Sequence, residues 1–336
     1  HAAKDLRVEE REMPSPGPGQ VLVKMAAGGI CGSDLHYYQH GGFGAVRLRE
    51  PMILGHEVSG HVEALGAGVD GLETGQLVAI SPSRPCYACK YCHAGTPQHC
   101  LNMRFYGSAM PFPHIQGAFR QFIVADAPQC VPADGLSAAE AAVGEPLSVC
   151  LHAAKQAGDL MGKRVLVTGC GPIGQLCVLV ARAAGAVEIV ATDIAPFTLS
   201  MAEKVGATRV INMAETPDGL EVYHAGKGHF GVHFECSGAA PALIAAIPAL
   251  RPRAVLVQLG LGGDMTLPVQ AMTAKEINFC GSFRFHEEFA TAIAMMQGGQ
   301  IDVTPLVTHS FALEEANAAF EMAADRSQAI KAQIVF

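Results

Sequence analysis

The sequence predicts an α/β protein in which a strand-rich region precedes a parallel sheet covered by helices on both faces. Three observations lead to this fold class. Short β-patterned segments separated by turns fill residues 1 to about 130, strands then alternate with helical stretches, and a glycine-rich turn joins one strand to the next helix. The chain of 336 residues has room for two domains at about 150 residues each.

The first region is expected to contain short strands bounded by proline and glycine turns such as the Pro14–Gly19 cluster. Helical patterning begins at Ala138. The strands expected before it are Leu6–Glu10, Val21–Ala26, Glu57–Leu65, Leu77–Ser81 and Phe119–Ala125.

After Lys163 the chain alternates between strand and helix, which predicts parallel pairing with a helix between successive strands. The segments expected are Val165–Thr168, Pro172–Ala184, Val187–Thr192, Pro196–Val205, Val232–Cys236 and Val255–Leu259. Two helices, Glu287–Met296 and Leu313–Ala324, and a final strand, Ala332–Phe336, complete the chain. Because no low-complexity linker interrupts it, the domains are expected to pack together with a cleft between them.

Composition excludes several classes of protein. Half of the residues are hydrophobic and 16% are charged, which excludes a disordered chain. The formal charge of −8 argues against nucleic acid or an anionic membrane as a partner and favours a small molecule or another subunit. No apolar run reaches the roughly 18 residues of a membrane span, and the N-terminus lacks the pattern of a secretion signal. We therefore expect a cytoplasmic protein.

Four of the eleven cysteines form a C-x2-C-x2-C-x7-C pattern: Cys86, Cys89, Cys92 and Cys100. Four thiolates on one tight loop complete a tetrahedral shell, so the pattern predicts a structural zinc site. The alternatives are four free thiols, or a zinc ribbon that grips DNA, for which the loop has few basic residues. Six other cysteines lie in apolar surroundings and are expected to be packing residues, namely Cys130, Cys150, Cys170, Cys177, Cys236 and Cys280.

A second set of metal-binding residue types is drawn from separate segments. Cys31 lies in a glycine-rich stretch, His56 and Glu57 follow Gly55, and Glu145 opens a helical stretch. Cysteine, histidine and carboxylate ligands from separate segments are typical of a catalytic zinc that keeps one position open. Taken singly, His56 is equally consistent with a buried core histidine, and Glu145 with a carboxylate that favours a helix start.

The stretch from Val165 to Gly174 is a strand followed by G-x-G-x-x-G. In this turn Gly169 permits the bend, Gly171 admits a pyrophosphate beside Pro172 and Ile173, and Gly174 lets helix and strand pack closely. The next strand ends at Asp193, at the spacing of an acid that binds the adenosine ribose. Asp193 would repel a 2′-phosphate, so NAD is favoured over NADP. The alternative is an ordinary strand-to-helix turn.

The glycine turn placed after two zinc signatures resembles the zinc-dependent medium-chain dehydrogenases, over essentially the whole chain. Gly55-His56-Glu57 and residues 145–149 are similar to the polyol (sorbitol) dehydrogenase branch, and the strings 29–39, 103–110 and 281–285 resemble a member that acts on a sugar acid. Sorbitol dehydrogenases usually have Arg-Tyr where this chain has Arg284-Phe285. The resemblance implies a GroES-like β-barrel catalytic domain, residues 1–151 and 285–336, and a Rossmann NAD-binding domain, residues 152–284.

The resemblance also implies roles for individual residues. Cys31, His56 and Glu57 would bind the catalytic zinc, and Glu145 would either bind it directly or orient its water. Ser33 and His36 would form a proton path, and Tyr37 and Phe105 would shape the substrate pocket. Arg284 would lie between cofactor and substrate, and Arg104 is a second candidate to bind a substrate carboxylate. Leu259, Ser282 and Phe283 would lie near the nicotinamide. For His36, Tyr37 and Phe105, surface or packing roles are equally open.

These features together predict a zinc-dependent enzyme that oxidises a secondary alcohol of an open-chain sugar acid reversibly, with NAD as the hydride acceptor. The alternatives are a general polyol dehydrogenase for sorbitol or xylitol, a threonine-type dehydrogenase, and a zinc- and NAD-binding sensor without turnover. The resemblance further suggests a homo-oligomer, as a tetramer.

Overall fold

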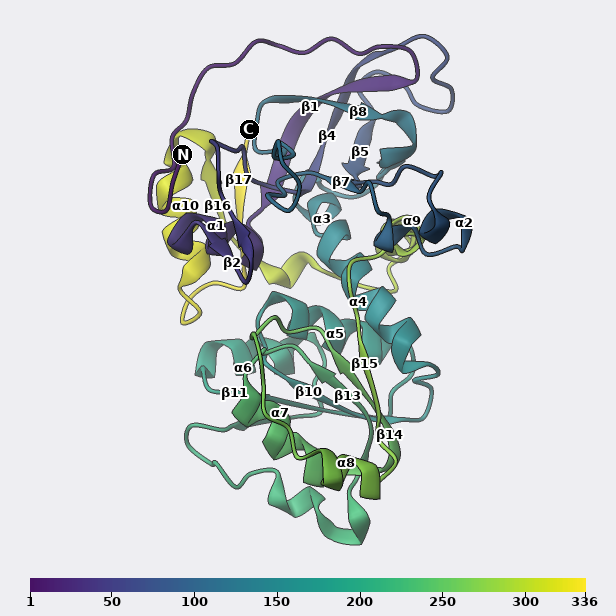
Figure 1. The fold of residues 1–336 in the computed structure, drawn as a ribbon, viewed down its shortest axis with the longest axis vertical. Helices are drawn as coiled ribbons and strands as arrows, with labels where there is room; N and C mark the ends of the chain where they lie inside the picture. Colours follow the sequence, from purple (N-terminus) through teal and green to yellow (C-terminus); the bar gives the residue numbers. More distant parts are fainter.

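The computed structural model describes residues 1–336 and shows two lobes, one above the other in Figure 1. The upper lobe contains strands from both ends of the chain, and the lower lobe contains the middle of the chain. The predicted α/β class is confirmed, since a parallel sheet lies beside a mainly antiparallel one. None of the helices is both long enough and apolar enough to cross a bilayer.

The upper lobe is built on a seven-stranded sheet in the order β16-β17-β1-β4-β5-β9, with β8 also paired to β1. Valines and isoleucines that alternate along these strands, such as Val21, Val23 and Ile123, are buried in its core. The strands are β1 Gln20–Gly29, β4 Glu57–Leu65, β5 Leu77–Ile80, β8 Phe122–Asp126, β9 Cys130–Pro132, β16 Val307–Ala312 and β17 Lys331–Val335.

Strand register brings distant segments to one end of this sheet. Gly29, the last residue of β1, lies opposite Glu57, the first residue of β4. On its other side β1 pairs antiparallel with β17, and the amide of Ile30 donates to the carbonyl of Ala332 at 3.0 Å. The residues just after β1, at the start of β4 and at the start of β17 therefore meet.

The lower lobe is a six-stranded parallel sheet in the order β12-β11-β10-β13-β14-β15. Its central strands are apolar on both faces because helices cover both. The strands are β10 Arg164–Thr168, β11 Glu188–Asp193, β12 Arg209–Asn212, β13 Phe230–Glu235, β14 Leu250–Gln258 and β15 Asn278–Gly281, and the helices are α5 Pro172–Ala183, α6 Pro196–Val205, α7 Ala240–Ala246 and α8 Val269–Ala274.

Two helices connect the lobes. Helices α4 (Gly144–Ala157) and α9 (Glu288–Gln297) pack on each other, and a buried pair joins His152 to Glu288 at 3.1 Å. The predicted domain boundaries, 151/152 and 284/285, fall within α4 and just before α9, and they stay a prediction. The remaining elements are α1 Gly32–His40, α2 Lys90–His93, α3 Ala138–Ala142, α10 Ala316–Ala324 and the ribbons β2 Gly42–Phe43 with β3 Val46–Arg47 and β6 Ser83–Arg84 with β7 Arg104–Phe105.

The strand expected at Leu6–Glu10 is wrong. These residues form an extended arm without strand pairing, and Val8 is 52% exposed, because no neighbouring strand lies alongside to complete a ladder. Helix α1 was missed. Its signal is the spacing of the buried residues Asp34, Tyr37 and Tyr38, one helical turn apart, which the polar residues between them conceal.

The buried His233 of β13 is expected to make stability depend on pH. Its Nε2 lies 2.9 Å from Thr168 Oγ1, and burial lowers the pKa of the imidazole to about 3. The unfolded chain takes up this proton near pH 6.5, so stability falls as the pH drops below that value. Between pH 7 and pH 5 the protein should lose about 2 kcal/mol more unfolding free energy than the His233→Gln variant.

Urea unfolding at both pH values measures this difference. His93→Gln, at an exposed position, is the matched control and should follow the parent protein. Parallel pH curves for His233→Gln and the parent would contradict the prediction.

Candidate active site

One buried carboxylate, that of Asp34, joins the two segments that carry the predicted metal ligands. Asp34 lies in α1 and is completely buried. Its Oδ2 accepts a hydrogen bond from the amide of Cys31 at 3.1 Å, and its Oδ1 accepts one from the amide of Gly55 at 3.0 Å. The same Oδ1 lies 3.7 Å from Nδ1 of His56. Asp34 therefore sets the separation of the two segments and places a negative charge beside the His56 ring.

Cys31, His56 and Glu57 come together as a compact group, which we call the Cys-His-Glu group. One donor atom from each lies within 4.8 Å of the others. Burial and the nearby Glu57 carboxylate raise the pKa of the Cys31 thiol to about 12, so the thiolate needs a cation beside it at neutral pH. A thiolate, an imidazole and a carboxylate at this spacing fit zinc with a fourth position left open.

Lys331 is a member of the site that sequence reasoning missed. It begins β17, its side chain is 4% exposed, and its Nζ donates to both carboxylate oxygens of Glu57 at 2.9 and 2.7 Å and to the carbonyl of Ile30 at 3.2 Å. A buried lysine of this kind requires an anionic partner, so the pair holds the Glu57 carboxylate in place. The signal in the sequence is a lysine at the start of an otherwise apolar terminal strand.

Glu145 lies at the beginning of α4, next to the Cys-His-Glu group but not within it. It is buried, and burial raises the pKa of its carboxyl to about 8, while nearby His56 opposes the rise. Glu145 is not among the donors that lie within 4.8 Å of one another. Whether Glu145 binds the metal directly or orients its water stays a prediction.

The four cysteines of the loop from residue 86 to residue 100 also come together. Their sulfur atoms are separated by 3.5 Å (Cys86 to Cys100), 3.6 Å (Cys89 to Cys92) and 4.0 Å (Cys89 to Cys100), and none is in a disulfide. A tetrahedral zinc with Zn–S bonds of about 2.3 Å requires sulfurs about 3.8 Å apart. The loop therefore fits a closed zinc site.

The glycine turn has the shape of a dinucleotide cradle. Gly169 has a φ of 85°, and a Cβ there would collide with the backbone of Ser237. A Cβ at Gly174 would collide with the Gly169 carbonyl, whereas one at Gly171 would meet nothing within 4 Å. The backbone around Gly169 and Gly174 is thus closely packed, whereas the space beside Gly171, just before α5, is free. A pyrophosphate binds at this position in dinucleotide-binding turns.

Other predicted cofactor residues lie at the carboxyl ends of the parallel strands. Asp193 ends β11, and its Oδ2 accepts the amide of Cys170 at 2.6 Å. Leu259 follows β14, and Ser282 follows β15, with its amide donating to the Gln258 carbonyl at 3.0 Å. Beneath them lies the buried Glu235, which sequence reasoning missed. Its carboxylate accepts Gln258 Nε2 at 2.6 Å and the Gly238 amide at 3.0 Å, tying these strand ends together.

Ser33 and His36 follow Cys31 along α1. Ser33 lies close enough to the Cys31 thiol to oppose the rise in its pKa, and both Ser33 and His36, one turn later, are partly exposed. Burial and nearby His40 lower the pKa of the His36 imidazole. The two side chains therefore lie between the Cys-His-Glu group and solvent.

Tyr37, Phe105 and Arg284 face the same group. The ring of Phe105 is 5.5 Å from that of His56, and the guanidinium of Arg284 lies 4.4 Å above the Phe105 ring. Burial lowers the pKa of the Arg284 guanidinium, while the charges of Glu145 and Tyr37 oppose this shift.

Arg104 is exposed and makes no hydrogen bond or ion pair. It precedes the inward-facing Phe105 on β7, so alternation along the strand directs it away from the His56 side. The structure does not bring Arg104 to the site.

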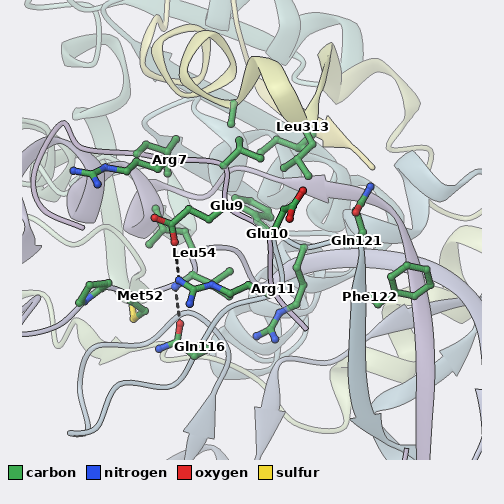
Figure 2. Close-up of a pocket in the computed structure, with 18 of the residues that line it drawn as sticks. Arg7, Glu9, Glu10, Arg11, Met52, Leu54, Gln116, Gln121, Phe122 and Leu313 are labelled. Carbon is green, nitrogen blue, oxygen red and sulfur yellow. Dashed lines mark hydrogen bonds and ion pairs between the residues drawn. The ribbon is translucent and has the colours of Figure 1, made fainter. Parts of the chain in front are cut away.

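One cavity lies away from the predicted site. It measures about 640 Å³ and lies between the N-terminal arm and the outside of the upper lobe. Figure 2 shows Arg7, Glu9, Glu10 and Arg11 of the arm around it, with Met52, Leu54 and Gln116 below, and an Arg11–Glu9 ion pair of 2.7 Å at its edge. None of the predicted site residues lines it.

Comparison with known proteins identifies the class. The description "Alcohol dehydrogenase GroES-like domain" matches residues 17–135, and "Zinc-binding dehydrogenase" matches residues 172–298. The chain therefore belongs to the zinc-binding dehydrogenases, and its cofactors are zinc and a nicotinamide dinucleotide, as the sequence predicts. The expected relation to the polyol dehydrogenases is confirmed by the relatives of known name.

Two named relatives are similar along most of their length. L-idonate 5-dehydrogenase (NAD(P)(+)) of Escherichia coli K12 is 43% identical over 317 residues, which cover 94% of this chain and 91% of the relative. Sorbitol dehydrogenase of Homo sapiens is 39% identical, with 96% and 90% covered. The crystal structure of the Escherichia coli L-idonate 5-dehydrogenase has a TM-score of 0.95 at 42% identity, covering 100% of this chain and 96% of that chain.

Removing the negative charge of Asp34 is expected to weaken zinc binding at the Cys-His-Glu group alone. Asp34→Asn keeps the size of the side chain but loses the negative charge beside His56, so zinc affinity there should fall by about 10- to 100-fold. Metal analysis after dialysis against a chelator should then find about one zinc per chain instead of about two, with the cysteine loop still loaded.

Asp70→Asn, at an exposed position, is the matched control. If Asp34→Asn retains as much zinc as Asp70→Asn under the same dialysis, Asp34 does not support the ligand group.

Proposed function

We propose that this enzyme catalyses the reversible oxidation of L-idonate to 5-keto-D-gluconate with NAD as hydride acceptor. The observation that carries the substrate class is Arg284, a half-buried guanidinium beside Phe105 and Glu145 at the Cys-His-Glu group. A half-buried guanidinium with no ion-pair partner suits a carboxylate, which it can bind through two hydrogen bonds. The relative of Escherichia coli named for L-idonate supports the same substrate.

The catalytic zinc would be held by Cys31, His56 and Glu57. When bound, zinc lowers the pKa of a substrate hydroxyl and the nicotinamide accepts the hydride that the carbon loses. The hydroxyl proton would leave through the Ser33 hydroxyl and the His36 imidazole, which lie between the group and solvent. Glu145 would orient the substrate hydroxyl or a water, and Lys331 would keep Glu57 in place.

The substrate chain would lie along Tyr37 and Phe105, with its carboxylate at Arg284. Tyr37 is held with its hydroxyl accepting the amide of Ala109 at 3.1 Å, so this wall of the pocket is preorganised. We assign the carboxylate to Arg284 and withdraw the candidate Arg104, because Arg104 is exposed and faces away.

The pyrophosphate of NAD would bind at Gly169, Gly171, Pro172, Ile173 and Gly174, and the nicotinamide would lie near Leu259, Ser282 and Phe283. Asp193 would bind the adenosine ribose. Its Oδ1 already accepts the amides of Ile194 and Ala195 at 2.7 and 3.0 Å, which fixes the carboxylate where a 2′-phosphate would be repelled.

We also propose a cytoplasmic homotetramer. The strand β15 pairs with β14 on one side only, and Phe279 on this edge strand is 44% exposed. In the same lobe Val269 and Leu261 are 63% and 74% exposed. Apolar side chains on an open edge favour burial against another copy. Eleven unpaired cysteines favour a reducing compartment. The mass of the particle in solution tests the assembly.

Substrate preference tests the function. NADH formation is followed with L-idonate, sorbitol, xylitol and threonine, and zinc is measured on the same sample. We expect the highest kcat/KM with idonate and a KM for idonate about ten-fold or more higher in Arg284→Met, because a charged hydrogen-bond partner is lost. Arg104→Met is the matched control and should leave that KM unchanged.

Activity with sorbitol or xylitol and none with idonate would replace the sugar acid by a neutral polyol, as the similarity to sorbitol dehydrogenase allows. Bound zinc with no turnover of any alcohol would indicate the non-catalytic alternative.

Cofactor preference tests Asp193. The double substitution Asp193→Ala with Ile194→Arg removes the repulsive charge and supplies a cation for a 2′-phosphate. The ratio of kcat/KM for NADP to that for NAD should rise by about 100-fold or more, since two charged contacts change. Asp159→Ala, an exposed aspartate outside the cofactor site, is the control. An unchanged ratio in the double variant would remove Asp193 from the ribose site.

A further inference from the structure

We propose that His99 of the cysteine loop is a positioning residue for substrate binding, which acts through Phe283 on Arg284. The inference rests on the proposed function of Arg284 and extends it to a part of the chain whose expected role was purely structural. The juxtaposition that carries it is a row of neighbouring rings, with the Arg284 guanidinium among them, that runs from the cysteine loop to the Cys-His-Glu group.

The row begins at the end of the cysteine loop. The His99 ring is stacked on the Phe283 ring, with centroids 6.1 Å apart and planes 21° apart. On its other side the His99 ring is 6.5 Å from that of Tyr91, a residue of the same loop. Cys92 follows Tyr91 and Cys100 follows His99, so a loop closed by metal restrains the backbone next to both rings.

The row continues through Arg284. Its guanidinium lies 4.9 Å from the Phe283 ring centre and 4.4 Å from the Phe105 ring centre, so it contacts one aromatic ring from each side of the site. Phe105 in turn lies 5.5 Å from the His56 ring. Each planar contact restricts the next, since a guanidinium is attracted to the faces of aromatic rings.

The backbone of this segment requires such support. Arg284 has a φ of 58°, in the left-handed region that a bulky residue rarely adopts. Two residues later the His286 ring lies 6.3 Å from that of Tyr87, another loop residue with a positive φ of 52°. The cysteine loop therefore contacts the segment on both sides of Arg284, at Phe283 and at His286.

The consequence is a link between the closed metal loop and substrate recognition. With the His99 ring removed, Phe283 loses its stacking partner and is already 44% exposed, so it can leave its position. Arg284 then keeps its charge but loses one of the two aromatic rings that restrict the position of its guanidinium. This change weakens binding of a carboxylate more than binding of a neutral polyol, whereas any effect on the nicotinamide beside Phe283 is the same for both substrates.

The test compares His99→Leu with His99→Phe, which restores an aromatic ring, and with His93→Leu, an exposed residue of the same loop that makes no ring contact. We expect His99→Leu to raise the KM for idonate by about 3- to 10-fold, with the KM for sorbitol changed less than two-fold and kcat changed equally for the two substrates. His99→Phe should recover the parent KM, and His93→Leu should equal the parent. Two zincs per chain in all variants confirm that the loop is intact.

Hydrogen exchange provides a readout that needs no turnover. Residues 282–287 should exchange faster in His99→Leu than in His93→Leu. Equal KM values and equal exchange in these two variants would overturn the inference. A loss of zinc with equal rises in both KM values would also overturn it, because the loop would then act on stability alone. A parent enzyme that does not oxidise idonate is a different result, since it refutes the proposed substrate before any variant is compared.

Discussion

The site depends on one buried carboxylate. Asp34 accepts the amides of Cys31 and Gly55 and faces the imidazole of His56, so a single side chain sets where two segments of the upper sheet meet. Burying a charge is costly unless it is fully hydrogen-bonded, and the same cost makes the arrangement rigid, because any displacement leaves the charge unpaired. The ligand geometry is thus held by a residue that is not itself a predicted ligand.

The second ion pair of the site has a related effect. Lys331 and Glu57 are both buried, and they join the last strand of the chain to the first residue of β4. Closing the sheet with β17 is therefore coupled to holding a ligand carboxylate, so the two ends of the chain both contribute to the chemistry. Around this centre, Phe105 and Arg284 form a wall that combines residues from segments almost 180 positions apart.

Much of the fold and the site could be predicted from short stretches of sequence, because a strand, a helix or a tight turn requires particular residue types at particular positions. The strands β4 and β10 and the helices α5 and α6 agree with their predicted bounds to within one residue, since their apolar periodicity is uninterrupted. By contrast, the strand at Leu6–Glu10 was wrong, because a pattern of alternation does not supply a pairing partner. Asp34, Lys331 and Glu235 were missed because buried charges are recognised by their partners, which are distant in sequence.

Sequence by itself determined the class of protein and its two cofactors. Cysteine spacing and the glycine turn are short-range constraints, because metal ligands and phosphate-binding loops require particular residues within a few positions. Tertiary structure decided which arginine lies beside Phe105 at the Cys-His-Glu group, which carboxylate belongs to that group, and that the cysteine loop contacts Phe283. Arg104 and Arg284 are the same residue type, so the sequence alone does not distinguish their roles. They differ because strand alternation turns one outward and a left-handed backbone turns the other between two aromatic rings.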